Sequence, residues 1–305
     1  MTPSVAPTSG RWSVLGVTWA TGAAHWRHRP DGRTASTTVP IVGTALSYRA
    51  LPTRVCLGHN EFTEHGRRYV DCGNDPGSAP RCDRCTAVEN VAAASMHQAH
   101  KLGRAYVDRR QTEHLDQPHR LYLAAFRDGS VKVGTSAGAS GGVRLVEQGA
   151  WVARYVGVHA DGYRVRDAED AVTEQLGVAQ AVSTQRKLRG LVAPRDDAEL
   201  EQRLDELAEQ VRRVVTTVDA DVHIVEDGAW KNPSADDERW QHVLAHPSRL
   251  DQGAHQLDVV DVVGRVGLVR RGADHLAVDL SQLRGVVIEF GDVDPDPIEV
   301  QASLF

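Results

Sequence analysis

The chain has 305 residues, of which 41% are hydrophobic and 25% are charged, as in a globular protein that buries a core. No apolar run reaches the roughly 18 residues that a membrane-spanning helix needs. The first residues, MTPSVAPTSGRW, have neither the basic start nor the apolar stretch of a secretory signal. We therefore expect a cytoplasmic protein without a membrane partner. The strong preference for arginine over lysine is typical of a GC-rich bacterial genome.

The formal net charge of −6 is unevenly distributed along the chain. Residues 1–150 contain 18 Lys and Arg against 12 Asp and Glu, a net charge of +6. Residues 151–305 contain 17 against 29, a net charge of −12. A basic first half is compatible with a phosphate-rich partner such as DNA or RNA, although the signal is mild.

The first 55 residues predict a β-rich region. The segment RWSVLGVTWA is followed by HWRHRPDGRTAST, in which PDG marks a turn, and then by PIVGTALSY. Residues 56–117 follow as a separate segment that contains all the cysteines of the chain.

The four cysteines predict a metal site in this segment. Disulfides are rare in the cytoplasm, and the last two cysteines form a CxxC, CDRC, which we expect on a tight turn. Zinc takes four tetrahedral ligands, and a closed site of this kind holds loops together without doing chemistry. We favour structural zinc held by all four cysteines. Two alternatives stay open: a ligand set that includes His59 from CLGH, and a redox pair of the last two cysteines. The four cysteines are Cys56, Cys72, Cys82 and Cys85.

Residues 118–195 predict a small sheet with flanking helices. LYLAAF and SVKVGT form a hairpin around Asp128 and Gly129, and a helix is expected from about Val143. RDAEDAVTEQLG predicts another helix that ends at Gly177.

Residues 196–220 predict a long amphipathic helix. Its apolar residues recur at spacings of three and four, with Asp196 at the start and Arg212 near the end, the polarity that the helix dipole favours. Packing on its own domain is favoured, and a coiled-coil dimer is the alternative. The apolar positions are Leu200, Leu204, Leu207, Val211, Val214 and Val218.

Residues 221–305 predict further strands, such as LDVVDVVGRVGLVRR and GVVIEFG, without a motif. This region either forms a separate small barrel or folds back onto the N-terminal strands as one domain with them. We therefore expect an α+β protein divided at 1–55, 56–117, 118–195, 196–220 and 221–305.

The order of motifs from 118 to 195 resembles the GIY-YIG nuclease superfamily. Tyr122 in LYL matches the end of the first motif, and Gly134 in KVG matches the end of the second. Arg144 and Glu169 match the arginine and the glutamate on the helices that follow. Lys132 stands where the second motif usually has a tyrosine. With the cysteines included, the order resembles an uncharacterised bacterial family with a GIY-YIG-like core, over about residues 50 to 195.

The resemblance implies metal-dependent hydrolysis of phosphodiester bonds in DNA or RNA. Glu169 would hold magnesium or manganese, and Arg144 would bind phosphate oxygens. Tyr122 would accept a proton from the attacking water. Lys132 would lower the pKa of Tyr122, bind the phosphate or, if desolvated, act as the base itself, and His119 is a further candidate base. The segment STQRKLRG would contact the nucleic-acid backbone through Arg186, Lys187 and Arg189.

Each of these residues also has an ordinary structural explanation. Tyr122 fits a core strand, Lys132 a solvated strand, Arg144 an ion pair with Glu147, and Glu169 a solvated helix face; the three basic residues at 186–189 fit a solvated helix end. Two other functions therefore stay open: a nucleic-acid-binding module without catalysis, and a small-molecule enzyme on the same fold.

Overall fold

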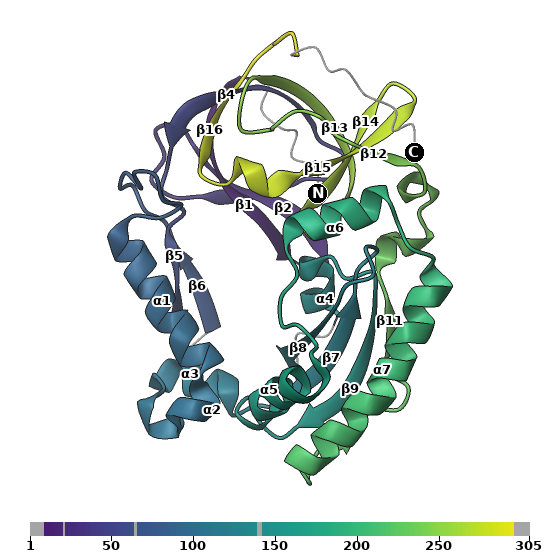
Figure 1. Ribbon diagram of the computed structural model, residues 1–305. Helices are drawn as coiled ribbons and strands as arrows, with labels where there is room; N and C mark the ends of the chain where they lie inside the picture. Colours follow the sequence, from purple (N-terminus) through teal and green to yellow (C-terminus); the bar gives the residue numbers. More distant parts are fainter. Residues whose placement is uncertain (1–8, 21, 64–65, 139–141, 296–305) are drawn as a thin grey trace. The chain divides into compact units, whose positions relative to one another are not determined.

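The structure is a computed structural model, which describes residues 9–20, 22–63, 66–138 and 142–295. It has the α+β fold that the sequence predicts (Figure 1). The chain forms two compact units. Unit 1 comprises residues 1–59, 69–87 and 234–305, and unit 2 comprises residues 60–68 and 88–233. The first eight residues, part of the segment between the predicted hairpin and the helix at Val143, and residues 296–305 lie outside the described residues.

Unit 1 is built on a nine-stranded sheet in the described part of the chain, with the order β12-β15-β14-β13-β4-β16-β1-β2-β3. Neighbouring strands are antiparallel except β12 and β15. Strand β16 lies between β1 and β4, so the C-terminal strands complete the N-terminal sheet. The strands are β1 (Gly10–Ala20), β2 (Ala23–Pro30), β3 (Thr37–Pro40), β4 (Ala45–Arg54), β12 (Val243–Ala245), β13 (Ala254–Val263), β14 (Val266–Arg271), β15 (Asp274–Asp279) and β16 (Val286–Phe290).

The core of unit 1 draws on both ends of the chain. Trp26, Tyr48, Val259 and Ile288 are all at most 2% exposed and belong to one hydrophobic cluster. Of the two arrangements left open for the last third of the chain, the strands from β12 onward therefore adopt the second, in which they share a domain with the N-terminal strands. Three 3-10 turns complete this region: η3 (Pro233–Asp236), η4 (Glu238–Trp240) and η5 (Leu280–Leu283).

The cysteine segment forms a short hairpin and a helix, namely β5 (His59–Thr63), β6 (Gly66–Val70) and α1 (Asp83–His97). Cys85 lies in the first turn of α1, whereas the sequence analysis expected a tight turn there. The residues after Cys85 include several alanines, which favour a helix. However, Cys85 is the one fully buried residue of α1 among those described, so the helix lacks an apolar stripe by which it could be predicted.

Unit 2 is built on an antiparallel sheet with the order β10-β9-β7-β8, and β11 also pairs with β9. Its strands are β7 (His119–Ala125), β8 (Val131–Ala137), β9 (Val152–His159), β10 (His223–Ile224) and β11 (Ala229–Lys231). Its helices are α2 (Ala99–Leu102), η1 (Arg104–Tyr106), α3 (Arg109–Leu115), α4 (Val143–Gln148), α5 (Arg164–Leu176), α6 (Thr184–Val192) and α7 (Asp197–Val218). The predicted hairpin and the helices expected near Val143, before Gly177 and after Asp196 are confirmed.

The two faces of this sheet are covered differently, because alternate strand residues point to opposite sides. On one face, Tyr122 packs with Leu145 of α4. On the other, Leu123 is paired with Arg154, which forms a two-pronged ion pair with Asp205 of α7 at 2.6 and 3.1 Å. Helix α7 therefore covers the second face, and α4 lies on the first.

The apolar stripe of α7 is used inside unit 2. Leu200, Leu204 and Val211 are at most 2% exposed, and α7 packs on β9, β7 and α5. Asp196 begins the helix by accepting hydrogen bonds from the backbone N–H groups of the two residues after Asp197. Apart from Val218, which is 40% exposed, the stripe packs on its own domain, as the sequence analysis favoured.

Candidate functional site

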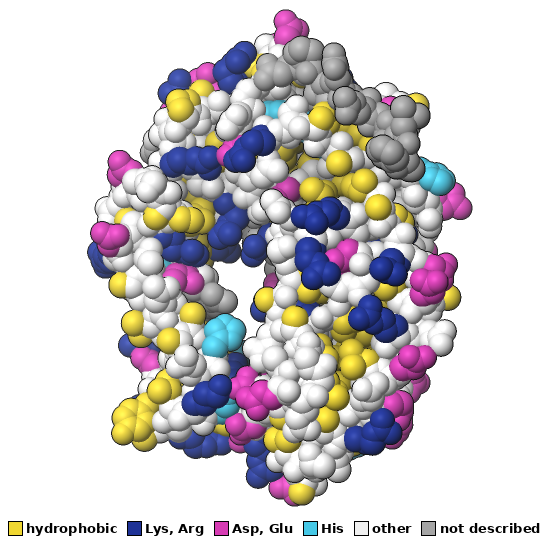
Figure 2. All heavy atoms as spheres, in the orientation of Figure 1, with side chains coloured by type: hydrophobic (Ala, Val, Ile, Leu, Met, Phe, Trp, Pro, Cys, Tyr) yellow, Lys and Arg dark blue, Asp and Glu magenta, His cyan; other side chains and the backbone are white. Residues whose placement is uncertain are grey.

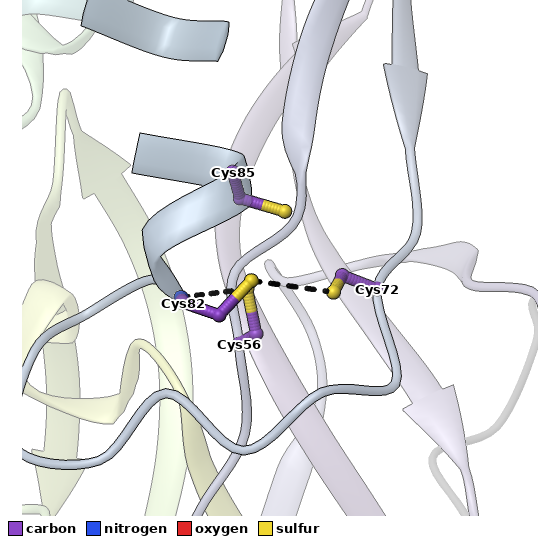
Figure 3. A group of neighbouring side chains, drawn as sticks. All are labelled: Cys56, Cys72, Cys82 and Cys85. Atoms are coloured by element: carbon purple, nitrogen blue, oxygen red, sulfur yellow. Dashed lines mark hydrogen bonds between the residues drawn. The ribbon is translucent and has the colours of Figure 1, made fainter. Parts of the chain in front are cut away.

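Four cysteine sulfurs gather in the N-terminal part of the chain (Figure 3). Cys56 follows β4, Cys72 follows β6, and Cys82 and Cys85 lie at the start of α1. Their Sγ atoms all lie within 4.8 Å of one another, and none of the four forms a disulfide. Four thiols at this spacing can hold one metal ion.

The loop that carries Cys56 is shaped by the glycine of CLGH. Gly58 has a φ of +64°, and a Cβ at this position would lie 2.2 Å from the carbonyl oxygen of Val70. Arg81 donates from Nε to the carbonyl of Gly58 at 2.8 Å, and Tyr69 donates from its hydroxyl to the carbonyl of Leu57 at 2.7 Å. These bonds join the loop after β4 to β6 and to the residues before α1.

His59 lies beside the sulfur group. Its Nδ1 is 3.3 Å from Cys85 Sγ, while the group whose donor atoms all lie together consists of the four cysteines. A histidine in this place can hydrogen-bond the sulfur of a ligand and so orient it. The backbone N–H of Cys85 lowers the pKa of Cys82 to about 6, which leaves that sulfur ionised at neutral pH and ready to bind a cation.

In unit 2, the glycine of KVG makes room for the tyrosine of LYL. Tyr122 on β7 and Gly134 on β8 are directly opposite each other in the sheet. A Cβ on Gly134 would lie 2.6 Å from Cζ and from the hydroxyl oxygen of Tyr122, so the ring lies across the glycine. Tyr155 packs edge-on against this ring at 6.3 Å between centroids. Tyr122 is 1% exposed, which agrees with the core-strand explanation for its ring.

Lys132 is not a solvated strand residue. It lies two residues before Gly134 on the same face of β8, is 8% exposed, and has its Nζ 5.8 Å from the ring centroid of Tyr122. Burial and, to a smaller extent, the positive charge of Arg144 lower the pKa of Lys132 to about 8, against the opposing charge of Glu169.

Helix α4 brings Arg144 and Gln148 to this face. Arg144 is exposed and forms the anticipated ion pair with Glu147, at 3.3 Å. Gln148 donates from Nε2 to the hydroxyl oxygen of Tyr122 at 3.0 Å. Because the amide is the donor, the phenol oxygen accepts, and the phenol proton points away from Gln148.

The three basic residues of STQRKLRG do not share one environment. Lys187 donates from Nζ to the carbonyl of Gln148 at 2.7 Å and lies 4.6 Å from the ring centroid of Phe126, so it holds the end of α4. Arg186 is exposed and paired with Asp128 at 2.9 Å, and Arg189 is exposed. Lys and Arg side chains gather over α6 on the face shown in Figure 2.

Glu169 occupies a partly buried position on α5, unlike its exposed neighbour Asp167. Burial raises the pKa of Glu169 to about 7, against the opposing charges of Lys132 and Arg166. Among the described residues, no side chain hydrogen-bonds its carboxylate. A desolvated carboxylate that no described side chain hydrogen-bonds is suited to hold a cation.

The structure adds two residues that the sequence analysis missed. Arg166 is 8% exposed and lies one turn before Glu169 on α5, with its guanidinium bonded to the carbonyl of Gly162. His97, at the end of α1, is exposed, and its pKa is lowered first by desolvation and then by the charges of Arg166, Arg144 and Lys132. Arg166 lies three residues before Glu169, and residues at this spacing share one face of a helix, so the sequence could have indicated that Arg166 lies near Glu169. No sequence signal indicated His97, because its helix was not predicted.

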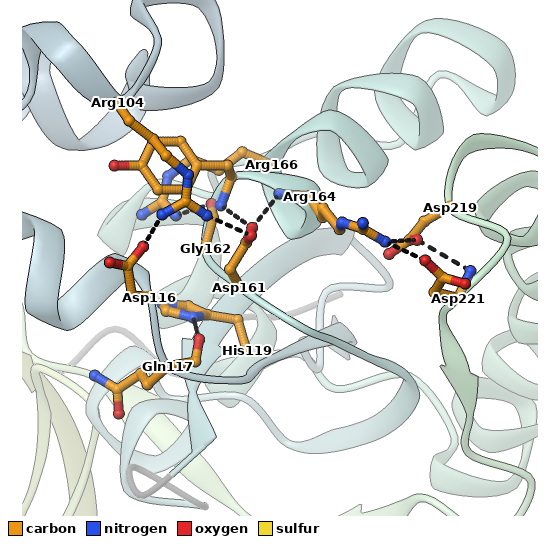
Figure 4. Close-up of polar contacts among 11 residues, drawn as sticks. Arg104, Asp116, Gln117, His119, Asp161, Gly162, Arg164, Arg166, Asp219 and Asp221 are labelled. Carbon is orange, nitrogen blue, oxygen red and sulfur yellow. Dashed lines mark hydrogen bonds and ion pairs between the residues drawn. The ribbon is translucent and has the colours of Figure 1, made fainter.

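An ion-pair network fixes the start of α5 (Figure 4). Asp161 accepts from the backbone N–H groups of Tyr163 at 2.9 Å and Arg164 at 2.8 Å, which begins the helix, and from Arg104 at 2.9 Å. Arg164 also binds Asp219, just after α7, at 2.9 Å. The helix that carries Glu169 is therefore held at its first turn from two sides.

His119 is unsuited to act as a base, although the sequence analysis named it as a candidate. It is 1% exposed, and its Nδ1 donates to the carbonyl of Gln117 at 2.8 Å. Burial lowers its pKa to about 4.

In the described residues, no helix is long and apolar enough to cross a membrane. No curated protein and no solved structure matches the chain. A family model described as "Protein of unknown function (DUF2797)" matches residues 43–247, which is more than half of the chain and includes the four cysteines and every site residue named above. The chain therefore belongs to the family of proteins of unknown function designated DUF2797.

Proposed function

We propose that this protein hydrolyses phosphodiester bonds of DNA or RNA with a GIY-YIG-like site that uses magnesium or manganese. The proposal rests mainly on one observation: three cationic side chains, Lys132, Arg144 and Arg166, lie near enough to lower the pKa of one carboxylate, Glu169. More positive than negative charge around a partly buried carboxylate suits an anionic substrate together with one metal ion. The opposed Tyr122 and Gly134, followed by Arg144 and Glu169 on later helices, support the resemblance to GIY-YIG nucleases.

The cations would hold the scissile phosphate. Arg144 is exposed and has a planar fork that matches two phosphate oxygens, so it can reach a polymer from the surface. Lys132 is buried beside Tyr122 and lies deeper in the site. A phosphate bound beside Lys132 would favour the charged amine and reverse part of the pKa shift that burial causes.

Tyr122 would act as a hydrogen-bond donor. Burial raises its pKa to about 12, so the phenol is neutral at physiological pH. Gln148 already donates to the phenol oxygen, which leaves the phenol proton free to bind a phosphate oxygen. The resemblance implies a proton-accepting tyrosine, and this environment favours the donor role instead.

Glu169 would hold the metal ion, which, when bound, supplies positive charge to the phosphate and the leaving oxygen. Its carboxylate fits this role because it is desolvated and has no side-chain hydrogen bond among the described residues, and a bound phosphate would balance the nearby cations. The four cysteines would hold a separate structural zinc, for which four closely spaced sulfurs and an ionised Cys82 are suitable.

The test of activity is cleavage of end-labelled single- and double-stranded DNA and RNA by purified protein with magnesium or manganese. We expect cleavage of at least one substrate, complete loss of cleavage when a chelator removes the added metal, and recovery when manganese is restored. An Arg144→Ala variant should cut at least about tenfold more slowly, because a charge-assisted bond to phosphate is lost. Metal-independent cleavage would contradict the role given to Glu169.

A second function, nucleic-acid binding without catalysis, is favoured by Lys132 in place of the second tyrosine. Among the described residues, the one group of three or more candidate metal ligands is the cysteine cluster. Binding alone would appear as an affinity that falls steeply with salt, and no turnover with any divalent ion.

A further inference from the structure

The amine of Lys132 has no polar partner in the part of the chain that the structure describes. Its side chain is 8% exposed and forms neither a hydrogen bond nor an ion pair there, and its Nζ lies 5.8 Å from the ring centroid of Tyr122. Lys101, by contrast, binds the carboxylate of Asp170 at 2.6 Å. A buried ammonium without an acceptor is unfavourable, so these surroundings favour the neutral amine.

The tip of Lys132 is nevertheless open to solvent. Several buried polar atoms without a partner are fully enclosed, among them Nε2 of His119 and Nε2 of His159. Lys132 Nζ is not one of these enclosed atoms, although it also has no partner among the described residues. The side chain therefore buries its carbon stem and leaves its nitrogen accessible, so a reactant can reach the amine.

The groups around the amine divide its work. Arg144 and Glu169 both act on the charge of Lys132, so the three side chains lie in one site. Arg144 is exposed and always charged, and it can hold a phosphate without help from the lysine. At pH 7 about a tenth of the Lys132 amine is neutral, against less than about a thousandth for an ordinary exposed lysine.

A desolvated lysine of this kind is a nucleophile for carbonyl carbon. Intact DNA and RNA contain no aldehyde. An abasic site in DNA does, because the deoxyribose that has lost its base opens to an aldehyde at C1′. The phosphates on either side of that sugar are the groups that Arg144 would hold.

We infer that Lys132 forms a Schiff base with the C1′ aldehyde of an abasic site in DNA and breaks the strand there without a metal ion. The inference rests on the nucleic-acid substrate proposed above. The Lys132 nitrogen bonds to C1′, and the carbonyl oxygen leaves as water with one proton from the amine and one from solvent, which gives a protonated imine. Water takes a proton from C2′, the electron pair of that bond passes to the imine, and the C3′–O bond then breaks, so that the phosphate leaves as an anion. Hydrolysis of the imine frees Lys132 and an unsaturated aldehyde.

The test traps the imine on the full chain. Parent protein is incubated with EDTA, sodium cyanoborohydride and an oligonucleotide that contains one abasic site, and the reductant converts the imine into a stable amine. We expect a covalent protein–DNA product, and none when thymidine replaces the abasic site. Proteolysis and mass spectrometry should place the sugar on Lys132. The trapping rate should rise with pH up to about 8, as the amine loses its proton.

Two variants identify the amine. Lys132→Arg keeps the positive charge but has no neutral form near pH 7, so it should give at least about 50-fold less product. The matched control Lys231→Arg, which changes an exposed lysine on β11, should stay within about twofold of the parent.

A product that persists in Lys132→Arg, or that maps to another amine of the parent, would overturn the inference. A parent that traps no abasic DNA would also overturn it; if that parent still cleaved intact nucleic acid with manganese, the proposed function would stand. Trapping on Lys132 by a protein that cleaves no intact nucleic acid would support the inference and contradict the proposed hydrolysis.

Discussion

Glycine and tyrosine depend on each other in the β7–β8 hairpin, and this pair shows how the site is built at the level of single residues. The ring of Tyr122 occupies the space that a side chain at Gly134 would need. Lys132 is then buried against the same ring, which accounts for its lowered pKa. The KVG triplet therefore has a steric cause, whatever reaction the site performs.

A Gly134→Ala variant tests this packing. The added methyl group must displace the buried ring, so we expect a loss of about 1–3 kcal/mol in the free energy of unfolding, the usual cost of overpacking. Chemical denaturation followed by tyrosine and tryptophan fluorescence measures it. Gly73→Ala is the matched control, since nothing lies within 4 Å of a Cβ there, and it should change stability by less than about 0.5 kcal/mol. Equal stabilities for the two variants would contradict the packing described.

At the residue scale, the sequence could indicate Tyr122, Lys132, Arg144 and Glu169 only through their joint order. It could not show that Lys132 is buried or that Lys187 holds Gln148, because both facts depend on contacts between distant segments.

Among the elements of unit 2, α5 is held at two points along its length. Its first turn is held by Asp161 and Arg164, and its middle is held by α2 through Asp170. Bonds from Lys101, Gln180 and His100 outweigh the effect of burial and lower the pKa of Asp170 to about 2, from an ordinary value of 3.8.

The Asp170 contact makes a pH-dependent contribution to stability. A carboxylate whose pKa is lower in the folded state stabilises the fold above its ordinary pKa, and this stabilisation is lost as the pH falls from about 4 to about 2. We expect Asp170→Asn to lower the free energy of unfolding at pH 7 by about 1–2 kcal/mol. The difference between variant and parent should shrink between pH 4 and pH 2, as measured by thermal denaturation across pH. A difference that stays constant down to pH 2 would show that Asp170 is not ion-paired in the folded protein.

At the element scale, strong periodicity and clear end signals made α5, α7 and the hairpin predictable. Helix α7 has an aspartate at its start and an apolar stripe, and α5 ends at Gly177 in the left-handed conformation. Helix α1 lacks an apolar stripe, so the sequence analysis expected a turn there and missed the helix.

For the molecule as a whole, the main result is that strands from both ends of the chain pair in one sheet of unit 1. The sequence predicted the strands but left their pairing open, because strand periodicity does not identify the neighbour in a sheet. The placement of β16 between β4 and β1 depends on which apolar faces fit together in one core.

Metal removal is the prediction at this scale. If zinc joins the loops around Cys56, Cys72, Cys82 and Cys85, freshly purified protein should contain about one zinc per chain. A strong chelator, or Cys85→Ser, should lower the Tm by at least about 5 °C, because loops with few apolar contacts lose their crosslink. Elemental analysis measures the zinc content, and thermal denaturation measures the Tm. A zinc content under half an equivalent, or an unchanged Tm after complete zinc removal, would contradict a structural zinc.

The most direct test of the proposed function compares nucleic-acid cleavage by the parent, Glu169→Gln and Asp167→Asn at saturating manganese. Both substitutions remove one negative charge from α5, but Asp167 is exposed, whereas Glu169 is partly buried among Lys132 and Arg166. We predict that Glu169→Gln lowers the cleavage rate at least about 1,000-fold while Asp167→Asn stays within about twofold of the parent, because under the proposal Glu169, and not Asp167, would bind the metal ion that stabilises the transition state. Cleavage by Glu169→Gln at the parent rate would show that Glu169 is not the metal ligand, and cleavage by none of the three proteins would rule out the nuclease.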